Sequence, residues 1–278
     1  MKLFNRNLKA FLKKFLNLDI RGFFKYLKKK YSAFDAYLVI RRYVNFDNGF
    51  IIDCGANDGI TNSNSYYLEK KRNWKCLLIE PSKKFKKLTK IRNNKLYHYN
   101  NASTSFKNDG KNINFAYLGL MTTVLNKAIA TKINEDTKIK KEDVSSTAWE
   151  ILKSSTSCTD FTNIDTDIPD SRYFFDAGKK HLKNHGENYH TFSVKGKSIT
   201  SMLDEIKAPN IIDFFSLDVE GMTIEVLEGV DFNKYTFKYI FAESYDFNKV
   251  SKFLTDRDYK FVKKVRWNYL FSHKNFCK

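Results

Sequence analysis

The sequence predicts an α/β protein built around a doubly wound parallel sheet. Three short apolar runs support this prediction, at residues 50–54, 75–80 and 211–218, and each closes on or beside an acidic residue. Apolar runs of this length, alternating with helical patterns, are typical of buried strands in a parallel sheet. Because ligands of such sheets bind at the carboxyl ends of the strands, the acidic residues there are the first candidates for a site.

The remaining elements follow in order along the chain. Helices are expected at about residues 33–44, 63–71, 82–92, 222–229 and 247–255. Between them, strands are expected at residues 50–54, 75–80, 95–100, 211–217 and 239–243. Two further runs, at about residues 259–265 and 267–273, are rich in aromatic residues and valine. Their tight connection predicts a C-terminal antiparallel hairpin.

Residues 104–190 interrupt this alternation of strand and helix. The stretch is long, polar and poor in strand pattern, which is typical of a functional lid or of a segment without regular structure. Because it follows the third strand, it can reach the carboxyl-end face, and we expect it to act as a lid there. His181, His185 and His190 stand at its end. One of them could act as a general base, although surface histidines without a catalytic role are the simpler interpretation.

The turn after the first strand narrows the choice of ligand. It contains Gly55 and Gly59 and has Asn57 where a dinucleotide fingerprint has glycine. Glycine permits close backbone approach, while Asn57 and Asp58 suit an amino-acid-like group better than a diphosphate. Glu80 follows Gly59 by 21 residues, close to the ~20-residue spacing at which an acid binds ribose hydroxyls. The pattern predicts a nucleoside-bearing cofactor, best S-adenosylmethionine; an ordinary strand–turn–helix without a ligand is the alternative.

The predicted cofactor-binding residues lie at the ends of the first three strands. They are Asp53, Gly55, Ala56, Asn57, Asp58, Gly59, Glu80, Pro81 and Asn101.

Three carboxylates at the ends of the fourth and fifth strands are the predicted catalytic residues: Asp218, Glu220 and Glu243. Both strand ends should open on the same face as the cofactor. A carboxylate whose pKa is raised by burial or by a like-charged neighbour can serve as a general base. The same three oxygen ligands could instead hold Mg²⁺. Glu220 also has a structural interpretation, as an acid beside Gly221 at the positive end of a helix dipole.

Three blocks together resemble the FkbM family of S-adenosylmethionine-dependent methyltransferases. They are Ile52-Asp53-Cys54-Gly55-Ala56-Asn57-Asp58-Gly59 through Glu80-Pro81, then residues 199–204, then Ser216-Leu217-Asp218-Val219-Glu220-Gly221 through Leu227-Glu228-Gly229. The resemblance implies a class I methyltransferase (Rossmann-like) fold. It also implies O-methylation, often of sugars in cell-surface glycans or natural products, so the expected acceptor is a sugar hydroxyl of a glycan or its precursor. A non-catalytic binding or scaffolding module with the same fold is the alternative. An NAD or nucleotide-sugar enzyme is disfavoured by Asn57.

Composition and charge divide the chain into two parts. Residues 32–278 suit one α/β domain, since the chain of 278 residues is 42% hydrophobic and 16% aromatic. Residues 1–30 hold ten basic residues and one acidic residue, a charge of +9 within a total of +18. Phenylalanine and leucine recur there at helical spacing. This pattern predicts that residues 1–31 form a basic amphipathic helix that lies on an anionic membrane surface. A helix packed on the domain is the alternative, and nucleic acid is a weaker interpretation.

The four cysteines show no metal-binding spacing, and Cys54 and Cys76 fall in predicted buried strands. Buried free cysteines suit a reducing compartment. No run approaches the ~18–20 apolar residues of a transmembrane helix. We therefore expect a cytoplasmic protein that is peripheral at the inner face of a membrane if its N-terminal helix binds there.

Overall fold

The computed structural model describes residues 42–92, 96–126, 164, 166–168 and 171–276. The predicted basic helix at residues 1–31 lies outside the described residues, as do most of the predicted helix at 33–44 and part of the predicted lid. Among the helices that are described, none combines the length and the apolar character needed to cross a membrane.

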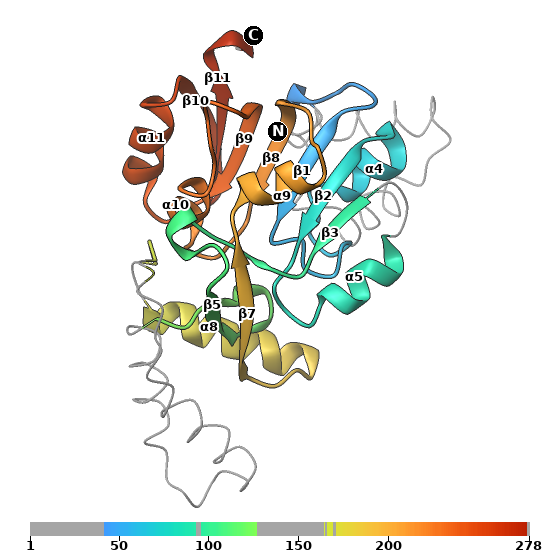
Figure 1. The fold of residues 1–278 in the computed structure, drawn as a ribbon. Helices are drawn as coiled ribbons and strands as arrows, with labels where there is room; N and C mark the ends of the chain where they lie inside the picture. Colours follow the sequence, from blue (N-terminus) through green and yellow to red (C-terminus); the bar gives the residue numbers. More distant parts are fainter. Residues whose placement is uncertain (1–41, 93–95, 127–163, 165, 169–170, 277–278) are drawn as a thin grey trace, which may run out of the picture.

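A seven-stranded sheet forms the centre of the protein, in the order β10-β11-β9-β8-β1-β2-β3 (Figure 1). Its strands are β1 (Phe50–Cys54), β2 (Lys75–Ile79), β3 (Leu96–Tyr99), β8 (Ile211–Leu217), β9 (Thr236–Glu243), β10 (Tyr259–Val265) and β11 (Asn268–His273). Neighbouring strands from β9 to β3 run parallel, and β11 runs antiparallel to both β9 and β10. The chain order reverses between β1 and β8, which is where ligands of doubly wound sheets bind.

Helices cover both faces of this sheet, which makes it doubly wound. They are α4 (Tyr66–Arg72), α5 (Phe85–Ile91), α9 (Ile199–Glu205), α10 (Thr223–Leu227) and α11 (Phe247–Thr255). Alternate residues of β1 point to opposite faces, as the two-residue period of a strand requires. Ile51 packs with residues of α4 and α5, whereas Ile52 packs with residues of α9, α10 and α11. Each fully buried aliphatic side chain of this kind stabilises the fold by about 1.5–3 kcal/mol.

A second sheet corrects the prediction that residues 104–190 are poor in strands. Its order is β4-β7-β5-β6, and its strands are β4 (Ala102–Ser103), β5 (Asn112–Tyr117), β6 (Thr123–Val124) and β7 (His190–Lys197). In β5, Ile113 and Phe115 pack into the main core, while Ala116 packs toward α8 (Ser171–His185). This alternation is a strand pattern, but polar neighbours obscure it in the sequence. Figure 1 shows β5, β7 and α8 together below the main sheet.

Glu225 of α10 ties the start of the second sheet to the main domain. Its Oε1 accepts hydrogen bonds from Thr104 Oγ1 at 2.6 Å, Ser105 Oγ at 2.7 Å, Asn108 Nδ2 at 2.8 Å and the Ser105 N–H at 3.0 Å. Burial alone would raise the pKa of Glu225, but the donors from Thr104, Asn108 and Ser105 together lower it below its usual value. The segment from β4 into the short helix η1 (Phe106–Asn108) is therefore held against α10.

Candidate active site

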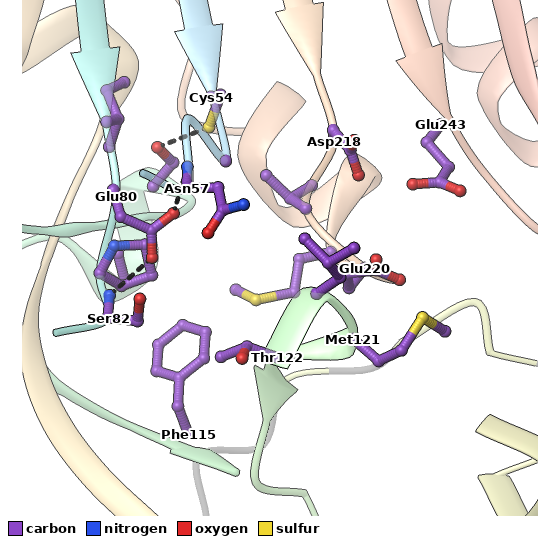
Figure 2. A pocket seen from close by; sticks show the side chains of 18 of the residues that line it. Cys54, Asn57, Glu80, Ser82, Phe115, Met121, Thr122, Asp218, Glu220 and Glu243 are labelled. Carbon is purple, nitrogen blue, oxygen red and sulfur yellow. Dashed lines mark hydrogen bonds between the residues drawn. The ribbon is translucent and has the colours of Figure 1, made fainter. Parts of the chain in front are cut away.

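A cavity of about 280 Å³ opens at the carboxyl ends of the central strands (Figure 2). The strand ends contribute Cys54, Glu80, Asp218 and Glu243 to its wall. The second sheet contributes Phe115, and the short helix η2 (Gly119–Met121) closes part of the opposite side. The cavity therefore lies between the two sheets, at the point where the order of the main sheet reverses.

Gly55 brings the turn after β1 into direct contact with the end of β8. Its φ is +86°, and a Cβ placed on it would stand 1.8 Å from the carbonyl oxygen of Asp218. The Asp218 N–H donates to the carbonyl oxygen of Cys54 at 3.0 Å, so the two strand ends are held side by side. Only glycine combines this backbone conformation with so close an approach.

Glu80 supports the other side of the same turn. The side chain is buried, and its two oxygens each accept one backbone N–H, from Asn57 and from Ser82, both at 2.8 Å. Burial raises the pKa of Glu80, although hydrogen bonds from the Ser82 side chain and from the backbone N–H groups of Ser82 and Asn57 favour its charged form. A carboxylate offers about four lone pairs, so it has room for one more donor, and Glu80 lines the cavity. Glu80 can therefore hold the turn and accept a hydrogen bond from a ligand at the same time.

The structure separates the predicted cofactor residues into two groups. Gly55, Asn57, Glu80 and Pro81 line the cavity. The others are absent from its described lining: Asp53, Ala56, Asp58, Gly59 and Asn101.

Asp53 lies on the face of β1 opposite to the cavity-lining Cys54. It accepts hydrogen bonds from Ser65 Oγ at 2.5 Å and Ser63 Oγ at 3.1 Å. The fully buried Arg92 reaches the same hydroxyls and donates to the carbonyl oxygen of Gly59 at 2.7 Å. Asp53 and Arg92 thus stabilise the glycine turn from the side away from the cavity. Asp53 lies on that side because successive side chains of β1 point to opposite faces of the sheet.

The remaining members of the second group also have other partners. Asp58 accepts a hydrogen bond from Lys87 Nζ at 2.8 Å and several from its own turn. Ala56 is buried in the core between the sheet and α4. Gly59 has a φ of +78° and packs against α5, and Asn101 donates to a backbone carbonyl of β7. These residues shape the turn and its surroundings.

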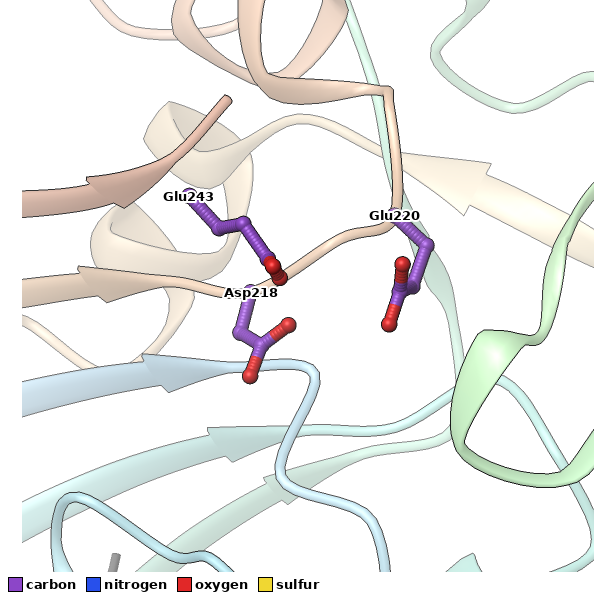
Figure 3. A group of neighbouring side chains, drawn as sticks. All are labelled: Asp218, Glu220 and Glu243. Atoms are coloured by element: carbon purple, nitrogen blue, oxygen red, sulfur yellow. The ribbon is translucent and has the colours of Figure 1, made fainter. Parts of the chain in front are cut away.

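The three predicted catalytic carboxylates do come together (Figure 3). One oxygen of Asp218, Glu220 and Glu243 each lies within 4.8 Å of the others. Glu220 has a φ of +46°, a conformation that is rare for residues other than glycine. Thr123 Oγ1 donates to its carbonyl oxygen at 2.7 Å, and Tyr245 Oη donates to its side chain at 3.3 Å. Helix α10 begins at Thr223 with Met222 as its N-cap, so Glu220 lies ahead of the helix, and it lines the cavity.

The crowding of carboxylates changes their protonation. Burial, followed by the charge of Asp218, raises the pKa of both Glu220 and Glu243 well above its usual range. Asp167 adds to the effect on both. The Asp167 N–H donates to the carbonyl oxygen of Gly221 at 3.1 Å, so the described end of the predicted lid reaches the site. Carboxyl groups that hold protons at neutral pH can donate hydrogen bonds as well as accept them.

The cluster is also the group of described residues that could hold a cation. Three carboxylate oxygens within 4.8 Å are hard ligands of the kind that Mg²⁺ prefers. Carboxylates that share protons satisfy the same geometry, and the raised pKa values accord with that state.

None of the three predicted histidines is among the described residues that line the cavity. His181 lies directly behind it, because a Cβ on Gly119 would stand 2.2 Å from His181 Nδ1. The rings of His181 and His185 stack at 4.1 Å. His190 packs against Tyr117 at 4.6 Å. Their roles here are in packing α8 and β7 against η2 and β5.

Sequence reasoning missed many of the other residues that line the cavity. They include Cys54, Thr61, Asn62, Ser82 and Met222 of the main domain, and Ser103, Phe115, Met121 and Thr122 of the second sheet and the adjoining η2 segment. The alternation in β5 could have indicated Phe115. The three residues of η2 and the Thr122 that follows them form too short a segment for any periodic signal.

The fold and the site define a class of protein: a doubly wound α/β protein with a cavity, walled in part by carboxylates, at the switch point of its sheet. The Methyltransferase FkbM domain matches residues 53–261 of the chain. Because the match covers about three quarters of the 278 residues, the chain belongs to the FkbM methyltransferase family, as its sequence blocks predicted. Among curated proteins and among solved structures, none matches the chain significantly.

Proposed function

We propose that the protein is an S-adenosylmethionine-dependent O-methyltransferase. The observation that carries the proposal is a single cavity with Glu80 on one side and three clustered carboxylates on the other (Figure 2). The remaining acceptor capacity of Glu80 suits a ribose hydroxyl, and the turn from Gly55 to Asn57 suits an aminoacyl end. When bound, S-adenosylmethionine supplies a methyl group on a positively charged sulfur, next to which carboxylates are favourable.

The carboxylate cluster would prepare the acceptor. In a direct displacement the acceptor oxygen bonds to the methyl carbon as the carbon–sulfur bond breaks, and its electron pair stays on sulfur. The hydroxyl proton must move to a base, for which we propose Asp218, the member of the cluster in contact with the glycine turn. Glu243, whose pKa is raised to about 12, and Glu220, whose pKa is also raised, would orient the acceptor by hydrogen bonds.

The proposed acceptor is a sugar hydroxyl of a cell-surface glycan or its precursor. The family resemblance supports this choice, and closely spaced carboxyl groups suit adjacent hydroxyls on a sugar ring. A non-catalytic binding or scaffolding module is the alternative, and it would not need this cluster.

Calorimetry with S-adenosylmethionine, its demethylated product and NAD tests the cofactor. Either of the first two should bind and raise the melting temperature. Glu80→Ala should weaken binding by about 1–3 kcal/mol, while Glu205→Ala, on the exposed surface, is the matched control. Binding of NAD alone would overturn the proposal.

Transfer of labelled methyl groups to a saccharide panel tests the chemistry. Asp218→Asn should lower turnover about 10²-fold or more with cofactor affinity nearly unchanged. Near-normal turnover of both Asp218→Asn and Glu243→Gln would show that neither carboxylate is the general base. His181 and His190 would then be the next candidates. Activity that disappears in chelator and returns with Mg²⁺ would assign the cluster to a cation instead.

We also propose that residues 1–30 bind an anionic membrane surface from the cytoplasmic side. Their ten basic residues and their phenylalanine and leucine content support this. The full chain should sediment with anionic vesicles at low salt and be released at high salt, because the attraction fades within a Debye length of about 8–10 Å. A chain lacking residues 1–30 should stay in solution and keep its cofactor affinity. Unfolding of the truncated chain, with no vesicle binding by the full chain, would show instead that this segment packs on the domain.

A further inference from the structure

We propose that Trp267, backed by Tyr245, is an acceptor subsite on which a sugar ring adjoining the methylated one stacks. The inference rests on the proposed function, and it assigns a binding role to the turn between β10 and β11. It also makes the acceptor a saccharide of at least two rings, of which the reacting ring is neutral.

The topology places Trp267 at the catalytic edge of the sheet. Strand β11 runs antiparallel to β9, and Asn268 pairs with Glu243, the last residue of β9. The Ser244 N–H donates to the carbonyl oxygen of Trp267 at 3.1 Å. The β10–β11 turn is therefore fastened to the chain immediately after Glu243.

Trp267 is exposed to an unusual degree. At 59% it is the most exposed of the large hydrophobic side chains in the described part of the chain. Its ring lies 6.0 Å from that of Tyr245, at an angle of 41°. Tryptophan offers a larger apolar surface than any other side chain, and leaving it in water forgoes the stabilisation of burial. Neither Trp267 nor Tyr245 is among the described residues that line the cavity, so a sugar ring stacked on Trp267 would lie outside it.

Tyr245 connects this surface to the carboxylates. Its hydroxyl donates to Glu220 at 3.3 Å, while its ring contacts Trp267 on one side and Phe174 of α8, edge-on at 6.3 Å, on the other. The aromatic row of Trp267, Tyr245 and Phe174 therefore borders the cluster of Asp218, Glu220 and Glu243.

The combination suits a saccharide. A pyranose ring has an apolar face of C–H groups, which packs on an aromatic face, and hydroxyls at its edge, which bond to carboxyl groups. Because Trp267 is one aromatic residue removed from the cluster, the ring on it is the neighbour of the reacting ring. A carboxylate or phosphate on the reacting ring would be repelled by the charges of Asp218 and Asp167. The reacting ring is therefore neutral.

The test is saturation-transfer NMR on the full chain, saturated with demethylated cofactor, using neutral disaccharides and their constituent monosaccharides as probes. We expect saturation of disaccharide ring protons in the wild type. Trp267→Ala should weaken disaccharide binding at least tenfold and monosaccharide binding less than threefold. Trp267→Phe should recover most of the loss. Phe106→Ala, which removes a 50% exposed aromatic residue on η1, is the matched control and should change neither.

Several results would overturn the inference. They are equal disaccharide binding by wild type and Trp267→Ala, absence of disaccharide contact in the wild type, and a Trp267→Ala change confined to vesicle binding. The last would assign Trp267, with the exposed Lys263 and Lys264 nearby, to a membrane surface. Cofactor calorimetry on the same variants keeps the two proposals apart. If the cofactor does not bind the wild type, the proposed function fails; if it binds all variants equally and saccharides ignore Trp267, the subsite alone fails.

Discussion

The carbonyl oxygen of Asp218 occupies the space that a side chain on Gly55 would need, 1.8 Å from the position of its Cβ. This contact joins the turn on the cofactor side of the cavity to the first residue of the carboxylate cluster. The distance between the two halves of the proposed reaction is therefore set by one glycine.

Gly55→Ala should destabilise the protein by about 3–5 kcal/mol, because alanine adds a backbone clash to the cost of a left-handed conformation. Gly110→Ala is the matched control: its φ is +78°, close to the +86° of Gly55, but nothing lies within 4 Å of its Cβ position. We expect a loss of about 1–2 kcal/mol there, from the conformation alone. Urea unfolding of both variants measures the difference, and equal losses would contradict the contact.

Glu243→Gln should stabilise the protein at neutral pH while lowering turnover. The pKa of Glu243 is raised in the folded state by burial and by Asp218, so its favourable contribution is present below the unfolded pKa of about 4.5 and is lost as pH rises. Glutamine is neutral throughout and avoids that loss. We expect a gain of about 1–2 kcal/mol at pH 7 that vanishes near pH 4. Thermal unfolding between pH 4 and pH 7 measures this gain in stability, with a substitution of an exposed residue, Glu228→Gln, as control. A gain that does not change with pH would contradict the raised pKa of Glu243.

Glu225→Gln should have the opposite effect and destabilise the protein at neutral pH. The pKa of Glu225 is lowered in the folded state by its donors, which outweigh burial. Its contribution is therefore present above the unfolded pKa and lost as pH falls through the folded value. We expect a loss of about 1–3 kcal/mol at pH 7 that narrows below pH 4. Asp256→Asn, which removes an exposed ion pair with Lys252, is the control in the same urea titrations. No loss at pH 7 would show that β4 is held by other contacts.

Arg92→Met should cost about 3–5 kcal/mol, because it removes a fully buried guanidinium and its ion pair with Glu69, which then keeps only Lys70, at 2.7 Å, as a countercharge. The double change Arg92→Met with Glu69→Leu should recover part of this loss. Since Arg92 also holds the carbonyl oxygen of Gly59, cofactor affinity should stay reduced in the double variant. Unfolding and calorimetry on both variants test this; full recovery of affinity would mean that Arg92 does not position the turn.

Much of the main sheet was predictable because its signals are local. Apolar runs, their length and the glycines after them lie within a few residues of one another. The predicted strand at 239–243 was nevertheless too short, since β9 begins at Thr236, where Lys238 interrupts the apolar run. That Glu80 lies beside the turn after β1, where it accepts the Asn57 N–H, could also be predicted, because the two follow neighbouring strands joined by one helix.

The sequence by itself determined the alternation of strand and helix, the glycine turn, Glu80, and the three acids that end strands. It could not determine which of these residues meet, because each meeting depends on packing between distant segments. Asp53 faces Arg92 rather than the cavity because β1 alternates its side chains between two covered faces. Thr123 and Asp167 reach Glu220 and Gly221 from far along the chain. Only the tertiary structure, by laying a second sheet of short strands across the strand ends, turned a polar insert into the wall of a site.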